Sequence, residues 1–115
     1  MALLYEQASP ALKEVFGALD TLMTSLGDDV TQKELKYYYA YRRIKNFACV
    51  EVHPQGGQLL VNLKVNPDDV HLEEGFTRDV RNVGHLGTGD LEVRISSFAD
   101  LERAKPLIEQ SYAAS

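Results

Sequence analysis

The first third of the chain has apolar residues three and four positions apart, a spacing that predicts an amphipathic helix. Ser9 followed by Pro10 supplies an N-cap and a first-turn proline, and Gly27 ends the pattern. We therefore expect a helix that begins near residue 10 and packs one face against a core. That face would be formed by Leu12, Val15, Phe16, Leu19, Leu22, Met23 and Leu26.

After Gly27-Asp28-Asp29 the pattern becomes one of strands. Residues 35–44 (LKYYYAYRRI), 47–53 (FACVEVH) and 58–65 (QLLVNLKV) read as three strands, joined by the turns KN and PQGGQ. We expect them to form an antiparallel meander that packs one face on the helix. In the third run the inward side would be Leu59, Val61, Leu63 and Val65, and the outward side Leu60, Asn62 and Lys64.

The last part of the chain predicts a loop, a strand and a helix. Residues 67–89 are polar and contain glycines, so we expect a long connection there. Residues 91–96 (LEVRIS) alternate, with Glu92 and Arg94 outward, and Ser97 caps a helix from Phe98 to about Tyr112. Pro106 indicates a kink in this helix or a later start. The fold class is α+β, with an N-terminal helix, an antiparallel sheet of about four strands, a long glycine-containing loop and a C-terminal helix.

The composition fits one globular domain over residues 1–115, with its core from about residue 10 to residue 112. Hydrophobic residues make up 44% and charged residues 25% of the 115 positions. The single cysteine, Cys49, excludes an intrachain disulfide and lies in an apolar run. No run approaches the roughly 20 apolar residues of a membrane span, so we expect a soluble, cytoplasmic protein without membrane contact.

Segment 77–90 (TRDVRNVGHLGTGD) concentrates arginine, histidine, aspartate and glycine. Arginines bind carboxylates and phosphates through planar donor forks, and glycines let the backbone approach a ligand closely. A strand follows the glycines, so the segment is not a strand–loop–helix phosphate loop, although it could form a nest of N–H groups for an anion. Structural roles for Asp79, His85 and the glycines are the alternative. The candidate ligand-binding residues here are Thr77, Arg78, Asp79, Gly84, His85, Gly87, Thr88, Gly89 and Asp90.

Segment 33–45 is locally basic, with five lysines and arginines against one glutamate, although the whole chain carries a net charge of −5. Its tyrosines alternate with cations, as in strands on which nucleic-acid bases stack. At least one set of alternating tyrosines must instead belong to the core. Tyr41, Arg42 and Arg43 are the candidate ligand-binding residues of this strand.

An enzymatic interpretation would use Asp79, His85, Asp90 and Glu92 as a hydrolytic or metal-dependent, nuclease-like centre. No serine or cysteine nucleophile is placed at recognisable spacing, so no catalytic residue is assigned. The three histidines form no close pair and there is no CxxC motif, so we expect no metal site and no cofactor.

Three runs together resemble a known family: YRRIKNFACVEV, FTRDVRNVGHLGTGDLEVRI, and DLERA followed by LIEQSY. The chain is similar, over nearly its whole length, to an uncharacterised bacterial and archaeal domain family whose stand-alone members are often labelled "predicted transport protein". Similar domains occur at the C-terminus of relatives of restriction nucleases. Many relatives have a tryptophan where this chain has Leu86. The resemblance implies a nucleic-acid-associated or defence context and no established activity.

We therefore expect a recognition module rather than an enzyme, which binds a nucleic acid, a nucleotide-like anionic ligand or a protein partner. The two candidate segments, 41–43 and 77–90, should lie side by side in one positively charged hollow. The hydrolytic enzyme is one alternative. A dimerisation or accessory domain, with an exposed apolar patch on the sheet, is another.

Overall fold

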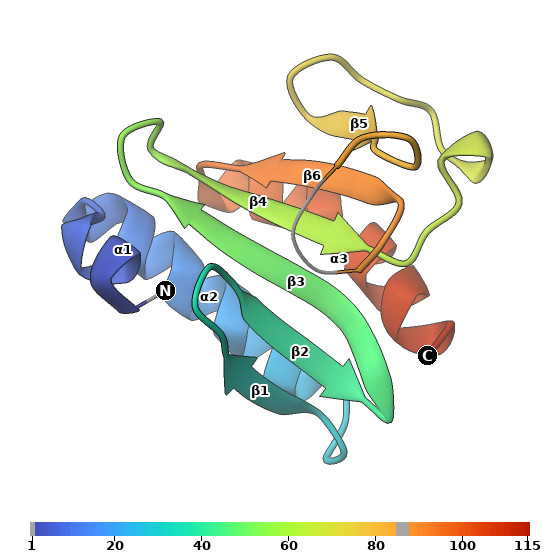
Figure 1. Cartoon of the computed structure of the whole chain (residues 1–115), viewed down its shortest axis with the longest axis horizontal. Coiled ribbons are helices and arrows are strands. Elements are labelled where there is room, and N and C mark those ends of the chain that lie inside the picture. Colours follow the sequence, from blue (N-terminus) through green and yellow to red (C-terminus); the bar gives the residue numbers. More distant parts are fainter. Residues whose placement is uncertain (1, 85–87) are drawn as a thin grey trace.

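The computed structural model describes residues 2–84 and 88–115 (Figure 1). A six-stranded, fully antiparallel sheet has the order β1-β2-β3-β4-β6-β5. The strands are β1 (Thr31–Glu34), β2 (Tyr39–Arg43), β3 (Lys45–His53), β4 (Gln58–Leu63), β5 (Thr77–Asp79) and β6 (Leu91–Ile95). The helices are α1 (Ala2–Gln7), α2 (Pro10–Ser25) and α3 (Phe98–Ala113), with a 3₁₀ turn, η1, at Pro67–Asp69.

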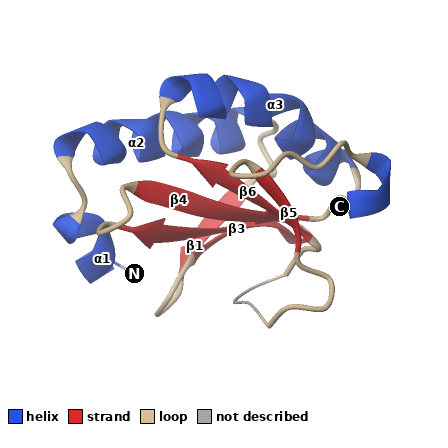
Figure 2. Cartoon of the chain, turned by 90° about the horizontal axis from the view of Figure 1, so that it is seen from above, coloured by secondary structure: helices blue, strands red, loops and turns tan. Residues whose placement is uncertain are grey.

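The long helices α2 and α3 cover one face of the sheet (Figure 2). Their apolar stripes meet the inward side chains of the central strands, as the alternation predicts, and this contact forms the core. We call the opposite side of the sheet the open face. The α+β class, the two long helices and the antiparallel sheet are confirmed.

Both long helices begin where their capping residues predict. The Ser9 hydroxyl accepts a hydrogen bond from the Leu12 amide at 3.1 Å, and Pro10 occupies the first turn of α2. The Ser97 hydroxyl accepts from the Asp100 amide at 3.1 Å, which caps α3. Pro106 lies inside α3. Phe98, the first residue of α3, is 53% exposed, because the buried stripe of the helix begins at Leu101.

Two strands were not predicted, and each lacks the apolar signal on which the prediction depended. Strand β1, at Thr31–Glu34, is exposed at every position and lies at the edge of the sheet. Strand β5, at Thr77–Asp79, is three residues long and falls within the predicted loop. The sheet therefore has six strands rather than about four. The first predicted strand is shorter than residues 35–44, because Leu35 to Tyr38 form the β1–β2 turn, closed by a 2.9 Å bond from the Leu35 amide to the Tyr38 carbonyl.

The two adjacent arginines of β2 point to opposite faces of the sheet, as alternation along a strand requires. The pairing shifts between Tyr41 and Arg42, and Ile44 in the turn has a φ of 66°. Arg43 contacts Tyr112 of α3, on the helix-covered side. Arg42 lies on the open face, where it lines a cavity with Ala40 and Lys64. Two adjacent arginines are thus separated by the sheet.

Candidate functional site: a basic groove on the open face

The described residues between β5 and β6, 80–84 and 88–90, lie on the open side of the sheet (Figures 1 and 2). The Asp90 amide donates to the Leu63 carbonyl at 3.1 Å, and the Thr88 amide donates to the Cys49 sulfur at 3.4 Å. Gly89 has a φ of 120°, and a Cβ there would lie 2.7 Å from the Leu63 carbonyl oxygen. Gly89 is therefore required for the close approach of two backbones, which holds Thr88 above the middle of the sheet.

Thr88 forms one wall of a groove of about 490 Å³ on the open face. The groove also has a partly apolar floor of Leu35, Tyr38 and Ala40, beside Asn46. We call this cavity the basic groove, because its remaining lining residues are all cations and no carboxylate lines it within the described part of the chain. These cations are Lys33, Arg42, Lys45 and Lys64.

The groove cations come from four places in the sequence that the sheet brings together. Lys33 of β1 pairs with Ala40 of β2, and Lys64 follows β4. Across residues 2–84 and 88–115, none of the four cations has an ion pair within 4.0 Å. The Arg42 guanidinium makes one long bond, of 3.3 Å, to the Ile44 carbonyl. Their positive charges are therefore available to a ligand.

Arg43 has a different environment. Its Nε lies 3.1 Å from Asp29 Oδ2, its Nη1 donates to the Tyr112 carbonyl at 3.3 Å, and its guanidinium lies 4.4 Å from the centre of the Tyr112 ring. The Tyr112 hydroxyl and Arg43 together hold the pKa of Asp29 below its ordinary value. These contacts tie the end of α3 to the sheet, so Arg43 has a structural role.

Tyr41, the third predicted residue of this strand, lies in the core. Its side chain is fully buried, and its hydroxyl donates to Asp20 Oδ1 at 2.7 Å and accepts from Gln32 at 3.1 Å. Burial raises the pKa of Tyr41 above its ordinary value. Of the three predicted residues in segment 41–43, Arg42 alone lines the basic groove.

The predicted residues at the start of segment 77–90 are divided among several environments. Thr77 is buried, and its hydroxyl accepts the Glu73 amide at 2.8 Å. Arg78 is exposed and lines a different cavity, of about 320 Å³, with Arg94. Asp79 bonds to Arg81, which also bonds to Asp68. The two predicted segments therefore share the basic groove only through Arg42 and Thr88, and the other described residues of the two segments lie elsewhere.

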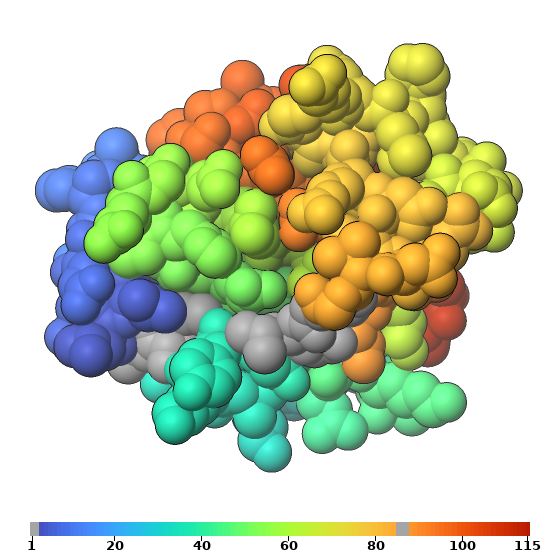
Figure 3. All heavy atoms as spheres, turned by 45° about the horizontal axis from the view of Figure 1, so that its top comes forward, coloured from blue at the N-terminus to red at the C-terminus, as the bar shows by residue number. Residues whose placement is uncertain are grey.

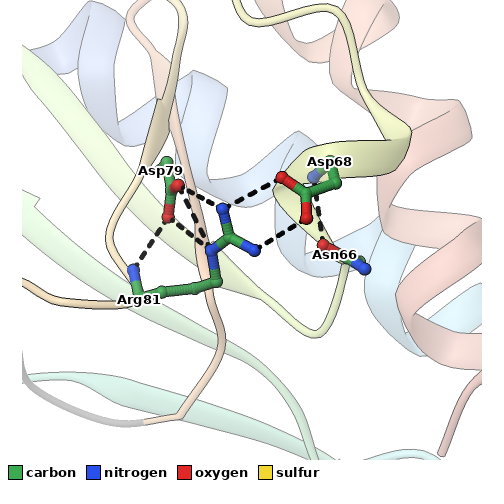
Figure 4. A network of polar contacts seen from close by, with 4 residues as sticks. All are labelled: Asn66, Asp68, Asp79 and Arg81. Atoms are coloured by element: carbon green, nitrogen blue, oxygen red, sulfur yellow. Dashed lines mark hydrogen bonds and ion pairs between the residues drawn. The ribbon is translucent and has the colours of Figure 1, made fainter.

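Arg81 is neutralised within the protein (Figure 4). Its Nη2 lies 2.8 Å from Asp79 Oδ2 and 3.0 Å from Asp68 Oδ1, and Asn66 holds the Asp68 amide at 3.0 Å. The hydrogen bonds that Arg81 donates hold the pKa of Asp79 low, and their acceptance by the Asp79 and Asp68 carboxylates raises the pKa of Arg81. This network fixes the start of the loop and leaves neither Asp79 nor Arg81 as a free ligand-binding group.

The remaining predicted loop residues divide into three groups. His85 and Gly87, like Leu86, lie outside the described residues. Gly84 has open space where a Cβ would lie. Asp90 lines a third cavity with Lys64 and Arg81, of about 460 Å³.

The proposed enzymatic residues do not converge on one cavity where they are described. Asp79 pairs with Leu91, whereas Glu92 pairs with Arg78, so Asp79 and Glu92 lie on opposite faces of the sheet. Glu92 is on the outward side as predicted but is buried, with 7% exposure, and its Oε1 lies 3.7 Å from Arg94 Nε. No group of three or more histidine, cysteine, aspartate or glutamate side chains in the described ranges could hold a metal ion.

Of the residues that line the groove, sequence reasoning assigned only Arg42 and Thr88 to a site. Lys33 and Lys45 were part of the basic segment, and Lys64 was an outward position of its strand, but none was assigned to a site. Tyr38 was placed within a strand rather than beside a cavity. Pairing between strands brings these residues together. For Lys33 this pairing involves β1, a strand that was not predicted.

These features define a small α+β domain with a sheet covered by helices on one face and a basic groove on the other. The chain belongs to the family described as a domain of unknown function, DUF5655, whose model matches residues 1–115. It is 26% identical over 100 residues to an uncharacterised protein of Haemophilus influenzae. The alignment covers 87% of this chain and 32% of that relative, so the chain spans about a third of the relative's length.

No solved structure matches the chain. In the described part of the chain, every helix is too short or too polar to cross a bilayer.

Proposed function

We propose that the protein is a recognition module that binds nucleic acid through the basic groove. The observation that carries this proposal is the charge of the groove. Four cations line it without a carboxylate among the described residues, on a chain whose net charge is −5. Uncompensated cations that converge on one cavity attract phosphates, and release of the phosphates' counterions favours binding.

The floor of the groove supports nucleic acid over a small inorganic anion. Leu35, Tyr38 and Ala40 supply apolar and aromatic surface beside the cations. A nucleotide has both a phosphate and a flat apolar base, and bases stack on aromatic side chains. Arg42 and Lys64 would contact the phosphates, and Tyr38 would contact a base or sugar.

The family resemblance adds a context for this role. Similar domains at the C-terminus of restriction-nuclease relatives would hold nucleic acid for a neighbouring catalytic domain. The Haemophilus influenzae relative, of which the alignment covers 32%, has room for further domains. In this proposal the module binds and does not catalyse, since Asp79 and Glu92 are on opposite faces of the sheet.

The alternative of a dimerisation domain has weaker support. The exposed large hydrophobic residues in the described part of the chain come from separate elements rather than from one strand face. They are Leu3, Tyr37, Ile44, Leu72, Val83 and Phe98. Self-association would be expected to use a contiguous apolar patch.

The proposal is tested by removing two groove cations together. Arg42→Ala combined with Lys64→Ala should weaken binding of a fluorescent single-stranded oligonucleotide by at least about tenfold, measured by anisotropy at low salt. The slope of log affinity against log salt should fall by about 1.4, because each lost phosphate contact contributes about 0.7 on a single strand. The thermal midpoint, followed by circular dichroism, should stay close to that of the unchanged protein.

A matched control removes two cations from the helix-covered side, by Lys13→Ala combined with Lys105→Ala. This pair changes the net charge by the same amount, and it should leave the affinity within about twofold, because screening limits distant charges. Equal losses in both double variants, or no loss in either, would contradict the proposal.

A further inference from the structure

A second cavity, which contains two arginines, also lies on the open face. It lies at the β5 edge of the sheet, whereas the groove lies near the β1 edge. The second cavity has a volume of about 320 Å³ and is lined by two arginines, Arg78 and Arg94, and one carboxylate, Glu74, together with Gly75, Phe76 and Thr77. Arg78 is exposed and makes no ion pair within 4.0 Å in the described residues. Arg94 is 42% exposed and lies 3.7 Å from the buried Glu92 carboxylate. We call Arg78 and Arg94 the arginine pair.

The pairing of the strands places the arginine pair and the groove on the same face. One row of directly paired residues runs across all six strands. Its members, in order, are Lys33, Ala40, Cys49, Asn62, Glu92 and Arg78. Lys33, in the groove, and Arg78 stand at its two ends. Five strand spacings of about 4.8 Å separate them by about 24 Å.

The middle of this row is covered, but the next row is not. Cys49 and Asn62 are buried, and Thr88 bonds to Cys49. The neighbouring row contains Glu51, Leu60 and Arg94, all partly exposed.

Tyr38, on the floor of the groove, immediately precedes β2 and lies beside the row that contains Glu51, Leu60 and Arg94. This row therefore gives a surface path from Tyr38 to Arg94. The Glu51 carboxylate on the path is bonded to His53 at 3.1 Å.

We propose that one single-stranded nucleic acid occupies both places, entering the basic groove and crossing the open face to the arginine pair. This inference rests on the proposed function and specifies its ligand. A span of about 24 Å suits the lower end of the site sizes of about 4–16 nucleotides that single-strand binders show.

The shape of this side of the molecule favours a flexible strand over a duplex. In Figure 3 the segment after β5 (orange) and the β3–β4 hairpin (green) are both seen on this side of the molecule. A duplex, stiff over about 150 base pairs, cannot bend into a groove of about 490 Å³, whereas a single strand can enter it and follow the surface. The proposal therefore predicts a preference for single strands that depends on their length.

The experiment measures affinity for oligothymidylates of increasing length, from about 2 to about 12 nucleotides, the upper length lying within the usual range of site sizes. The unchanged protein should bind the longest at least about tenfold more tightly than the shortest. Arg78→Glu should remove most of this gain while leaving the affinity for the shortest within about twofold. Arg94→Gln provides an independent second variant, since Arg94 also lies near Glu92.

The control is Lys105→Glu, a charge reversal on an exposed position of α3, which should change no affinity in the series. The inference is overturned if Arg78→Glu and Arg94→Gln leave the length dependence intact, or if a duplex or an acidic peptide of equal charge binds as tightly as the single strand.

Failure of this inference is separable from failure of the proposed function. Loss of short-oligonucleotide binding in the Arg42/Lys64 double variant, together with an unchanged length dependence in Arg78→Glu, would leave the groove as a nucleotide site and remove the crossing strand.

Discussion

The helix-covered face of the sheet and the basic groove on the open face differ in how their polar side chains are paired. On the helix-covered face, polar side chains are paired within the protein: Tyr41 bonds to Asp20, and Arg43 bonds to Asp29 and stacks on Tyr112. On the open face, the groove cations have no carboxylate partner within the described residues. The same residue types therefore stabilise the fold on one side and leave charge available on the other.

This difference shows that the type and position of a residue in the sequence do not establish its role. Arg42 and Arg43 are neighbours with the same charge, yet one lines the groove and the other joins α3 to the sheet. Arg81 is part of the predicted binding segment 77–90 and is bonded to two aspartates. An arginine is a candidate for ligand binding when the fold leaves it without a partner, and a structural residue when the fold neutralises it.

The largest expected effect concerns the backbone that holds the loop on the open face. Gly89→Ala should destabilise the protein by about 3 kcal/mol, because the new residue would be strained at a φ of 120° and its Cβ would meet the Leu63 backbone at 2.7 Å. The free energy of unfolding in urea measures this. Since Thr88 lines the groove, oligonucleotide affinity should also fall.

Gly57→Ala is the control for this change. Gly57 also has a positive φ, of 63°, but no atom lies within 4 Å of the position its Cβ would take. The cost should be about 1 kcal/mol, from backbone conformation alone. Equal costs at the two glycines would show that the contact between Gly89 and Leu63 does not hold the loop in place.

A smaller effect tests the internal pairing of the helix-covered face. Tyr41→Phe removes the hydroxyl that bonds to Asp20 and should cost about 1 kcal/mol at neutral pH. Burial raises the pKa of Tyr41 above 10.0, so above pH 10 the unfolded chain loses this proton while the folded protein keeps it. Stability should therefore fall as pH rises above 10, and the fall should be shallower in the variant.

The measurement is a series of urea titrations of both proteins from neutral pH to about pH 11, which spans the ordinary tyrosine pKa of about 10. The two stability curves should approach each other at the alkaline end. Parallel curves over the whole range would mean that the Tyr41 proton is not linked to folding.

The sequence predicted the elements that carry a strong apolar period or a cap. Helices α2 and α3 begin at Ser9-Pro10 and at Ser97 as expected, and β3, β4 and β6 follow their alternation. Strands β1 and β5 were missed because edge strands expose most of their side chains, so the alternation of buried and exposed positions is weak there.

The candidate site was predicted less completely, for a physical reason. Lys33 joins the other cations through the pairing of β1 with β2, and strand β1 was not predicted. Alternation separates Arg42 from Arg43, but the sequence does not indicate which of the two faces the helices cover. His85 and Gly87 lie outside the described residues, and their predicted roles stay predictions.

The most direct test of the account compares Arg42→Gln with Arg43→Gln, measuring both oligonucleotide affinity and the free energy of unfolding. Arg42→Gln should lower the affinity by about fivefold, about 1 kcal/mol, and leave stability unchanged. Arg43→Gln should lower stability by up to about 1 kcal/mol, through loss of a partly exposed ion pair and a cation–π contact, and leave the affinity within about twofold. If both variants lose affinity equally, or if Arg42→Gln loses stability alone, the distinction between the two faces is wrong.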